Sequence, residues 1–309
     1  MKGTLQAVLR AAARPRRSAL YLPGSNARAL EKACTLACDV LILDLEDAVA
    51  PEKKELARMQ IVEALKDKEA FGRREVVVRV NGLDTPWGMD DLRALAHPIA
   101  PALDAILLPK VESIDPVAEA DNQMAIPVGG GHGSGRGGGV PIWCMIETPL
   151  GVLRAPSLAE DARVGCLVAG TSDLSTDLRC DGEWNSRAAL VHSLSHTVLA
   201  ARAFGKAVLD GVHLQFKDLD RLEHSCIQGR NLGFDGKTLI HPTSIETANK
   251  VFSPSDEEVA RARKVIEAFE EASRAGSALA VLNGKLIEAL HVREAERLLE
   301  LCKAISESE

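Results

Sequence analysis

The sequence predicts an α/β fold, a TIM (β/α)8 barrel with a C-terminal helical extension. Eight apolar runs of β-type residues alternate along the chain with amphipathic stretches of helical length. Several of these runs end in ionisable residues, and α/β enzymes collect such groups at one rim of a parallel sheet or barrel. The chain has 309 residues, 46% of them hydrophobic, and no linker-like break in composition, so it can bury the core of one large barrel.

The predicted strands and helices follow one another in regular order. Strands are expected at residues 19–22, 40–43, 76–80, 105–108, 142–146, 166–169, 207–209 and 238–240. Helical patterns lie between most of them, for example at residues 26–37, 51–65, 186–204 and 219–232. Gly233 directly follows the last of these helices, as a glycine C-cap does. Eight strand–helix units are the number that closes a barrel.

The remaining segments lie outside the eight units. Three helical segments are expected after the last strand, around residues 255–275, 277–288 and 292–306. The predicted organisation is therefore a barrel domain at 17–252 and a helical extension at 253–309. The glycine-rich stretch 128–139 has no GxxxxGK[ST] pattern and precedes a strand, so we expect a surface insertion and no phosphate loop.

The first 16 residues form a basic N-terminal segment. No acid occurs before residue 18, and Leu5, Val8 and Leu9 can form one face of a short helix. Such a segment is typical of a mitochondrial presequence, but it lacks the usual serines and length, so a basic tail is an equal alternative. We expect a cytoplasmic or mitochondrial matrix protein that is not secreted, and cleavage of residues 1–16 stays open.

Composition limits the partners. The formal net charge is −7 and the basic residues are scattered, which argues against a nucleic-acid partner. No apolar stretch approaches the roughly 20 residues of a membrane span, so no membrane association is expected. The seven cysteines form no CxxC pair or zinc spacing, which fits a reducing compartment.

Charged residues at four strand ends predict a metal-dependent active site. Glu147 and Asp173 each follow an apolar run, Arg79 lies near the end of a third, and Asp44, Glu46 and Asp47 end a fourth. One such residue is often a helix cap or half of a surface ion pair. Agreement among four strands favours function for the set. Mg²⁺ commonly takes one or two protein carboxylates plus water and substrate oxygens, so Glu147 and Asp173 are the predicted ligands.

Six motifs in register resemble one known family. They are Arg17-Ser-Ala-Leu-Tyr-Leu-Pro-Gly24, Leu43-Asp-Leu-Glu-Asp-Ala-Val49, Val78-Arg-Val-Asn81, Ile146-Glu-Thr-Pro149, Gly170-Thr-Ser-Asp-Leu174 and Gly236-Lys-Thr-Leu-Ile-His-Pro242. Together they resemble the citrate lyase beta-subunit-like CoA-ester lyases, the malyl-CoA and citramalyl-CoA lyase group of the HpcH/HpaI aldolase/citrate lyase family. The resemblance implies a Mg²⁺-dependent barrel that assembles as a homo-oligomer, a trimer or hexamer.

The resemblance assigns roles to the matching residues. Glu147 and Asp173 would bind Mg²⁺, and Arg79 would clamp the substrate's carboxylate and oxyanion by two-point contact. Glu46 and Asp47 would orient metal-bound water or Arg79. For three further residues, a functional and a purely structural role are equally expected. Asp44 could equally cap the next helix, Gly24 could serve only a tight turn, and His241 could be structural. Arg17 and Gly24 would lie near the CoA thioester arm, and Pro149 is a further substrate-binding candidate.

The implied reaction is a reversible carbon–carbon cleavage. Malyl-CoA, methylmalyl-CoA or citramalyl-CoA would give acetyl-CoA or propionyl-CoA and a 2-keto acid, so the expected partners are an acyl-CoA and a small keto acid. The family's malyl-CoA lyases use an aspartate from the C-terminal extension of a neighbouring subunit to transfer a proton at carbon. This chain has Glu288 there, one methylene longer, and Glu288 is the candidate acid. Residues 181–187 are expected to influence substrate choice.

Other functions remain possible on the sequence alone. One is a CoA-independent aldolase for free hydroxy-keto acids, although such relatives tend to have histidine where this chain has Asp47. Another is a citrate-lyase-type subunit or non-catalytic acyl-CoA binder, which the intact Arg79, Glu147 and Asp173 disfavour. Thioester hydrolysis would use the same metal site. The keto acid and its stereochemistry stay open.

Overall fold

The computed structural model describes residues 14–96, 100–124, 139–182, 187–277 and 279–308. Contacts divide the chain into a barrel unit, Arg16–Lys250, and a C-terminal unit that begins at Val251. This boundary lies two residues before the one expected from the sequence. Most of the basic segment 1–16, most of the glycine-rich stretch and part of 181–187 lie outside the described residues.

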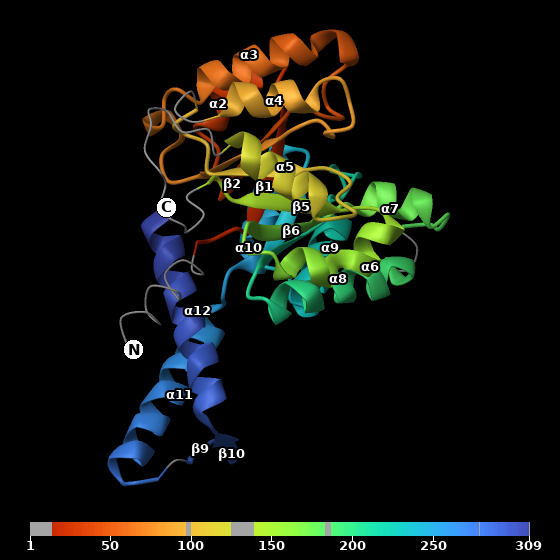
Figure 1. Cartoon of the computed structure of the whole chain (residues 1–309). Coiled ribbons are helices and arrows are strands. Elements are labelled where there is room, and N and C mark those ends of the chain that lie inside the picture. The colour runs from red at the N-terminus through yellow and green to blue at the C-terminus, as the bar shows by residue number, and fades with distance from the viewer. Residues whose placement is uncertain (1–13, 97–99, 125–138, 183–186, 278, 309) are drawn as a thin grey trace. The chain divides into compact units, whose positions relative to one another are not determined.

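The barrel unit is a closed, eight-stranded parallel barrel, which confirms the predicted fold class (Figure 1). Each strand pairs with the next along the chain, and the last pairs with the first. The strands are β1 Ser18–Pro23, β2 Val40–Asp44, β3 Glu75–Arg79, β4 Ala105–Leu108, β5 Ile142–Ile146, β6 Val164–Ala169, β7 Ala207–Asp210 and β8 Gly236–Leu239. All eight lie within two residues of their predicted positions.

Helices follow the strands as right-handed crossovers require. They are α2 Ala27–Ala33, α3 Lys54–Ala64, α4 Gly88–Leu95, α5 Asp115–Met124, α6 Pro149–Glu160, α7 Thr171–Asp177, α8 Val191–Ala203, α9 Leu219–Leu232 and α10 Ile245–Phe252. Helix α9 has its predicted bounds, and Gly233 caps it at a φ of 102°, a conformation that glycine adopts without steric cost. None of the described helices is long and apolar enough to cross a membrane.

Strand alternation decides which side chains enter the barrel. Successive side chains of a strand point to opposite faces, so every second residue belongs to the interior. Trp143 and Met145 of β5 lie in the interior cluster, as do Val40 and Ile42 of β2 and Val77 of β3. The same alternation carries the next inward position of each strand to the carboxyl-end rim. Those three positions hold Glu147, Asp44 and Arg79 respectively.

The C-terminal unit contains two long helices and a β-hairpin. Helix α11 (Asp256–Arg274) begins with a capping box between Ser255 and Glu258, and it packs along α12 (Ala289–Ser308) (Figure 1). Between them, β9 (Ala280–Leu282) and β10 (Lys285–Ile287) pair antiparallel.

The expected helix at residues 277–288 is therefore wrong. Asn283 and Gly284 have positive φ values of 50° and 75°, the conformation of a tight two-residue hairpin turn. The Asn-Gly pair between two short apolar runs was the available signal, and it outweighed the helical pattern read from the surrounding residues.

Candidate active site at the carboxyl-end rim

Arg79 is the central cation of the rim. Its Nε and Nη2 donate hydrogen bonds to the two carboxylate oxygens of Asp44 at 2.7 and 2.6 Å, and its guanidinium lies over the ring of Tyr21. Burial alone would lower the pKa of Arg79, but the bonded Asp44 carboxylate raises that pKa above its usual value. Arg79 therefore stays charged at any working pH.

The bond to Asp44 limits the nitrogens of Arg79 that a substrate can reach, and the expected role of Arg79 as a two-point clamp stays a prediction. One edge of its fork is already occupied by Asp44, and Nη1 is the nitrogen that faces Glu46 and the sulfur of Met145. Asp44 is also not the cap of the next helix, because its oxygens accept the N–H groups of Glu46 and Ala48. Asp44 thus fixes Arg79 and the acidic loop together.

Glu46 is buried at the rim with unsatisfied hydrogen-bonding capacity. Its Oε2 lies 2.8 Å from Nη1 of Arg79, yet it accepts no hydrogen bond of good geometry from any described residue. Burial raises the pKa of Glu46. Asp47 is exposed, and its carboxylate lies 3.8 Å from the same Nη1. Both acids are therefore placed to hold Arg79, which was one of their two predicted roles.

Glu147 is a buried carboxylate held by a backbone group. Its Oε1 accepts the N–H of Lys110 at 2.7 Å. A side chain at Gly170 would come within 2.3 Å of the Glu147 Cβ, so glycine is required there. Burial raises the pKa of Glu147 to about 7; the Lys110 N–H lowers it, and the charges of Glu46 and Asp173 raise it further.

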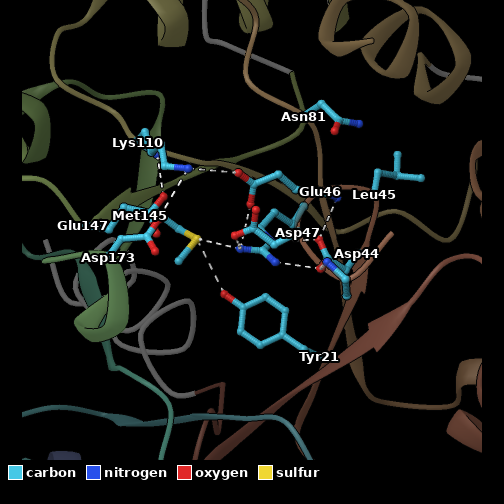
Figure 2. Close-up of polar contacts among 12 residues, drawn as sticks. Tyr21, Asp44, Leu45, Glu46, Asp47, Asn81, Lys110, Met145, Glu147 and Asp173 are labelled. Carbon is cyan, nitrogen blue, oxygen red and sulfur yellow. Dashed lines mark hydrogen bonds and ion pairs between the residues drawn. The ribbon is translucent and has the colours of Figure 1, made fainter. Parts of the chain in front are cut away.

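Asp173 reaches the rim from the first turn of α7, directly after β6. Its side chain is 40% exposed, and its Oδ2 lies 3.4 Å from Nζ of Lys110. Figure 2 shows Lys110, Glu147 and Asp173 grouped together, with the Lys110 side chain extending toward Glu46, 3.7 Å from its Oε1. The two predicted metal carboxylates therefore lie at one site.

Lys110 is the functional candidate that the sequence reasoning missed. It follows β4 after Pro109 and has a left-handed backbone, with a φ of 49°. Burial works against its charge, but Glu46 and Asp173 raise the pKa of Lys110. A cation two residues beyond the predicted strand 105–108 was the available signal. Its contacts with three of the rim acids depend on barrel closure and could not be read from the sequence.

The rim residues fit a Mg²⁺ ion. Within the described residues, no group of three or more His, Cys, Asp and Glu side chains converges as a complete metal cage. Mg²⁺ does not require one, because it keeps several waters and commonly takes one or two carboxylates plus substrate oxygens. Glu147 and Asp173 supply hard oxygen donors, and the unsatisfied Oε2 of Glu46 can accept a hydrogen bond from water. These three carboxylates would hold and orient the hydrated ion.

Arg17 is not part of this rim, which corrects its predicted place beside a CoA arm. It precedes β1, so it lies at the amino end of the barrel. There its Nη2 and Nε donate to the two oxygens of Asp39 at 2.8 and 2.9 Å, and both side chains are buried. Arg17 has a structural partner far from the carboxyl ends of the strands.

Gly24 and Pro149 do lie at the rim. A Cβ on Gly24 would meet Ile61 at 2.6 Å and the carbonyl oxygen of Asp44 at 2.9 Å, so the turn after β1 requires glycine for packing alone. Pro149 is the first residue of α6, where its fixed φ suits a helix start, and Thr148 caps that helix. Substrate contact by either residue stays a prediction.

Two other candidates have local partners. His241 stacks on Phe216 with 4.5 Å between ring centroids, and its Nδ1 lies 2.8 Å from Thr243 Oγ1. Glu288 belongs to the C-terminal unit, where its side chain is exposed and its backbone N–H donates to Nδ1 of His291 at 3.0 Å. The proton-donor role of Glu288 stays a prediction.

Comparison with known proteins identifies the relatives of this barrel. The family model described as HpcH/HpaI aldolase/citrate lyase matches residues 17–242. A (3S)-malyl-CoA thioesterase of Cereibacter sphaeroides is 47% identical over 295 residues, covering 95% of this chain and 97% of that protein. An L-malyl-CoA/beta-methylmalyl-CoA lyase of the same species is 31% identical, with 95% and 96% covered.

A solved structure extends the comparison. The protein CitE from Mycobacterium tuberculosis, in complex with magnesium, acetoacetate and coenzyme A, aligns with a TM-score of 0.73 and 29% identity. The alignment covers 94% of this chain and 99% of that one. Magnesium, a keto acid and coenzyme A are thus ligands of a structural neighbour.

Proposed function

We propose that this chain, which belongs to the HpcH/HpaI aldolase/citrate lyase family, acts with Mg²⁺ on a malyl-CoA-type 3-hydroxyacyl-CoA. Members of the family are lyases, so the chain is an enzyme of the carbon–carbon lyase type that acts on CoA esters. The proposed reaction breaks the carbon–carbon bond and yields acetyl-CoA or propionyl-CoA and a 2-keto acid. Methylmalyl-CoA and citramalyl-CoA are 3-hydroxyacyl-CoA esters of the same kind and are the other candidate substrates. The observation that carries this proposal is the convergence of Arg79, Glu46, Glu147, Asp173 and Lys110 at one rim.

The residues divide the work of the reaction. Glu147 and Asp173 would hold Mg²⁺, which when bound supplies Lewis-acid stabilisation to substrate oxygens. Arg79 would use Nη1, the nitrogen not bonded to Asp44, to stabilise the oxygen that gains charge, and Asp44 keeps its guanidinium from turning. The exposed Lys110 ammonium balances the acids and attracts an anionic substrate.

The cleavage requires two proton movements. The substrate hydroxyl gives its proton to water at the rim as its oxygen becomes the keto oxygen, and the electrons of the broken bond move to the carbon next to the thioester. An acid must then protonate that carbon. We assign this step to Glu288, within a homo-oligomer in which one subunit completes its neighbour's site. A trimer or hexamer would satisfy that requirement.

Hydrolysis of the thioester is a second candidate for the same site. The supporting observation is the 47% identity to a protein named (3S)-malyl-CoA thioesterase, against 31% to the malyl-CoA lyase. In hydrolysis, water replaces the CoA thiol at the thioester carbonyl, and the hydroxy acid is released intact. Glu288 then has no carbon to protonate, which fits its departure from the aspartate of the malyl-CoA lyases.

Product analysis tests both reactions. The purified protein would be incubated with Mg²⁺ and malyl-CoA, methylmalyl-CoA or either citramalyl-CoA stereoisomer, with a sample in EDTA and Glu147→Gln as controls. Acetyl-CoA or propionyl-CoA together with a keto acid identifies cleavage. Free CoA thiol together with the intact hydroxy acid identifies hydrolysis.

Two negative outcomes are also informative. Activity that persists in EDTA and in Glu147→Gln would rule out the assigned metal site. Inactivity of a folded, Mg²⁺-binding protein on the whole panel would favour a CoA-independent aldolase or a non-catalytic citrate-lyase-type subunit.

A further inference from the structure

Lys54 is a buried lysine to which the proposed reaction gives no role. It lies at the start of α3, and its Nζ donates to the carbonyl oxygens of Leu45 and Glu46, both at 2.8 Å, and to Oδ1 of Asn81 at 2.7 Å. An ammonium has three N–H donors, and here all three are used. A buried charge is costly unless such partners hold it, so this arrangement fixes the geometry of its acceptors.

The acceptors belong to the loop that carries Glu46. On its other side, the N–H of Leu45 donates to the carbonyl oxygen of Arg79 at 2.9 Å, and the N–H of Glu46 donates to Asp44 at 2.9 Å. The loop is therefore bonded through its amide groups to the pair Arg79–Asp44 and through its carbonyl groups to Lys54. This two-sided attachment sets where the Glu46 carboxylate can lie.

Arg58 provides an internal comparison. It lies one turn after Lys54 on α3, and its Nε donates to Asp91 at 2.7 Å. Asp91 in turn accepts the side-chain amide of Asn81 at 2.6 Å. Arg58 and Lys54 thus belong to one buried network, but their direct partners differ, because Lys54 bonds the loop of Glu46 and Arg58 bonds the start of α4.

We propose that Lys54 is a positioning residue for the reaction, because it sets the place of the Glu46 carboxylate beside Nη1 of Arg79. This inference rests on the proposed function at the same rim. Oε2 of Glu46 lies 2.8 Å from Nη1, so a shift of its loop moves the carboxylate that faces the one guanidinium nitrogen not bonded to Asp44. Misplacement of about 1 Å can cost 10²-fold in rate. Within the described residues, the hydrogen bonds of Lys54 Nζ go to Leu45, Glu46 and Asn81 and not to the predicted metal carboxylates of Glu147 and Asp173.

The test compares Lys54→Met with Arg58→Met in the full chain. Lys54→Met keeps an unbranched side chain of similar length and removes the three N–H donors. We expect kcat to fall about 10–100-fold with KM changed less than about 3-fold. Arg58→Met should leave kcat within about 3-fold while disturbing the same network. Mn²⁺ affinity, followed by electron paramagnetic resonance, should stay unchanged in both variants.

A double-mutant cycle with Glu46→Gln separates positioning from general structural support. If Lys54 acts through Glu46, adding Lys54→Met to Glu46→Gln should cost little further kcat. Equal losses in the two backgrounds, or equal losses in Lys54→Met and Arg58→Met, would overturn the proposal. If Lys54→Met does not fold, Lys54→Gln, which keeps a donor, takes its place with the same criteria.

Hydrogen exchange provides a readout that does not depend on the reaction. Amides 45–48 should exchange faster in Lys54→Met than in Arg58→Met or the unsubstituted protein, because their carbonyl attachment is lost. Unchanged exchange would contradict the proposal even if the enzyme were inactive on every thioester. Inactivity of the unsubstituted protein with faster exchange in Lys54→Met would instead count against the proposed function alone.

Discussion

The two ends of the barrel carry the same kinds of charged residue in opposite arrangements. At the amino end, Nε and Nη2 of the buried Arg17 donate to the two carboxylate oxygens of Asp39. Nη2 of Arg16 donates to Oε1 of Glu75 at 2.8 Å. Arg16 and Arg17 therefore each have a carboxylate partner of their own.

At the carboxyl end, the carboxylates outnumber the cations that pair with them. Arg79 is already matched by Asp44, and the remaining acids share Nη1 of Arg79 and the half-exposed Lys110. Oε2 of Glu46 accepts no hydrogen bond from the part of the chain that the structure describes, and burial raises the pKa of Glu147 to about 7. Unmatched buried charge costs stability, so this end is shaped by binding and the other by folding.

The largest effect that would test this contrast is expected for Glu147→Gln. The substitution keeps the side-chain shape and should lower kcat/KM on the order of 10³-fold, since a bound metal contributes several kcal/mol. The free energy of unfolding at pH 8 should stay equal or rise, because a buried carboxylate with a raised pKa is removed. Steady-state kinetics, Mg²⁺ calorimetry and urea unfolding measure these quantities.

Glu75→Gln at the amino end is the matched control for this prediction. It should lower the free energy of unfolding, because the partly buried Arg16 loses its carboxylate partner, and leave kcat/KM close to that of the unsubstituted protein. If both variants lost stability and activity together, the division between the two ends would be wrong.

Arg17→Met should give the next largest effect. Removing this guanidinium leaves the buried Asp39 without an opposite charge, and breaking such a pair costs about 3–5 kcal/mol of stability. Urea unfolding would measure that loss, and KM for the thioester should be unchanged. A raised KM at unchanged stability would instead restore the role beside the CoA arm that the sequence suggested.

The pH dependence of Mg²⁺ affinity should be a smaller effect than those of Glu147→Gln and Arg17→Met, and it should be confined to pH values below about 7. In the metal-free protein, burial raises the pKa of Glu147 from 4.5 to about 7, so its contribution to stability is present below pH 4.5 and is lost as pH rises through 7. A metal ligand must be deprotonated, so Mg²⁺ affinity should fall about tenfold per pH unit below 7. Calorimetry between pH 5.5 and 8 tests this, and a flat profile would contradict it.

Lys110→Gln should produce the smallest effect, with opposite signs for two ligands. Without this ammonium the rim becomes more negative, so Mg²⁺ should bind more tightly and the anionic thioester more weakly, each by a few fold as expected for a partly exposed ion pair. The backbone N–H that holds Glu147 remains in this variant. Calorimetry and KM would show the two changes, and a parallel change would argue against charge balance as its role.

The sequence predicted the rim because its signals are local. Apolar runs mark strands, and a charged residue at the end of a run must lie near the end of that strand, so Glu147, Asp173 and Arg79 were found without a structure. Arg17 was misplaced although it precedes the first run, and its position before the strand already indicates the amino end. The hairpin at residues 280–287 was missed for a comparable reason, since the Asn-Gly turn was present in the sequence.

The sequence by itself determined the family, the barrel and the strand ends from which the reactive groups come. Tertiary structure alone decided how the charges are matched: that Asp44 holds Arg79, that Lys110 turns back to Glu147 and Asp173, and that Lys54 reaches the loop of Glu46. The physical reason is the separation along the chain of the residues on which each feature depends. Strand formation and side-chain alternation depend on neighbours in the chain, whereas the partner of a buried charge is fixed only when the closed barrel brings distant strands together.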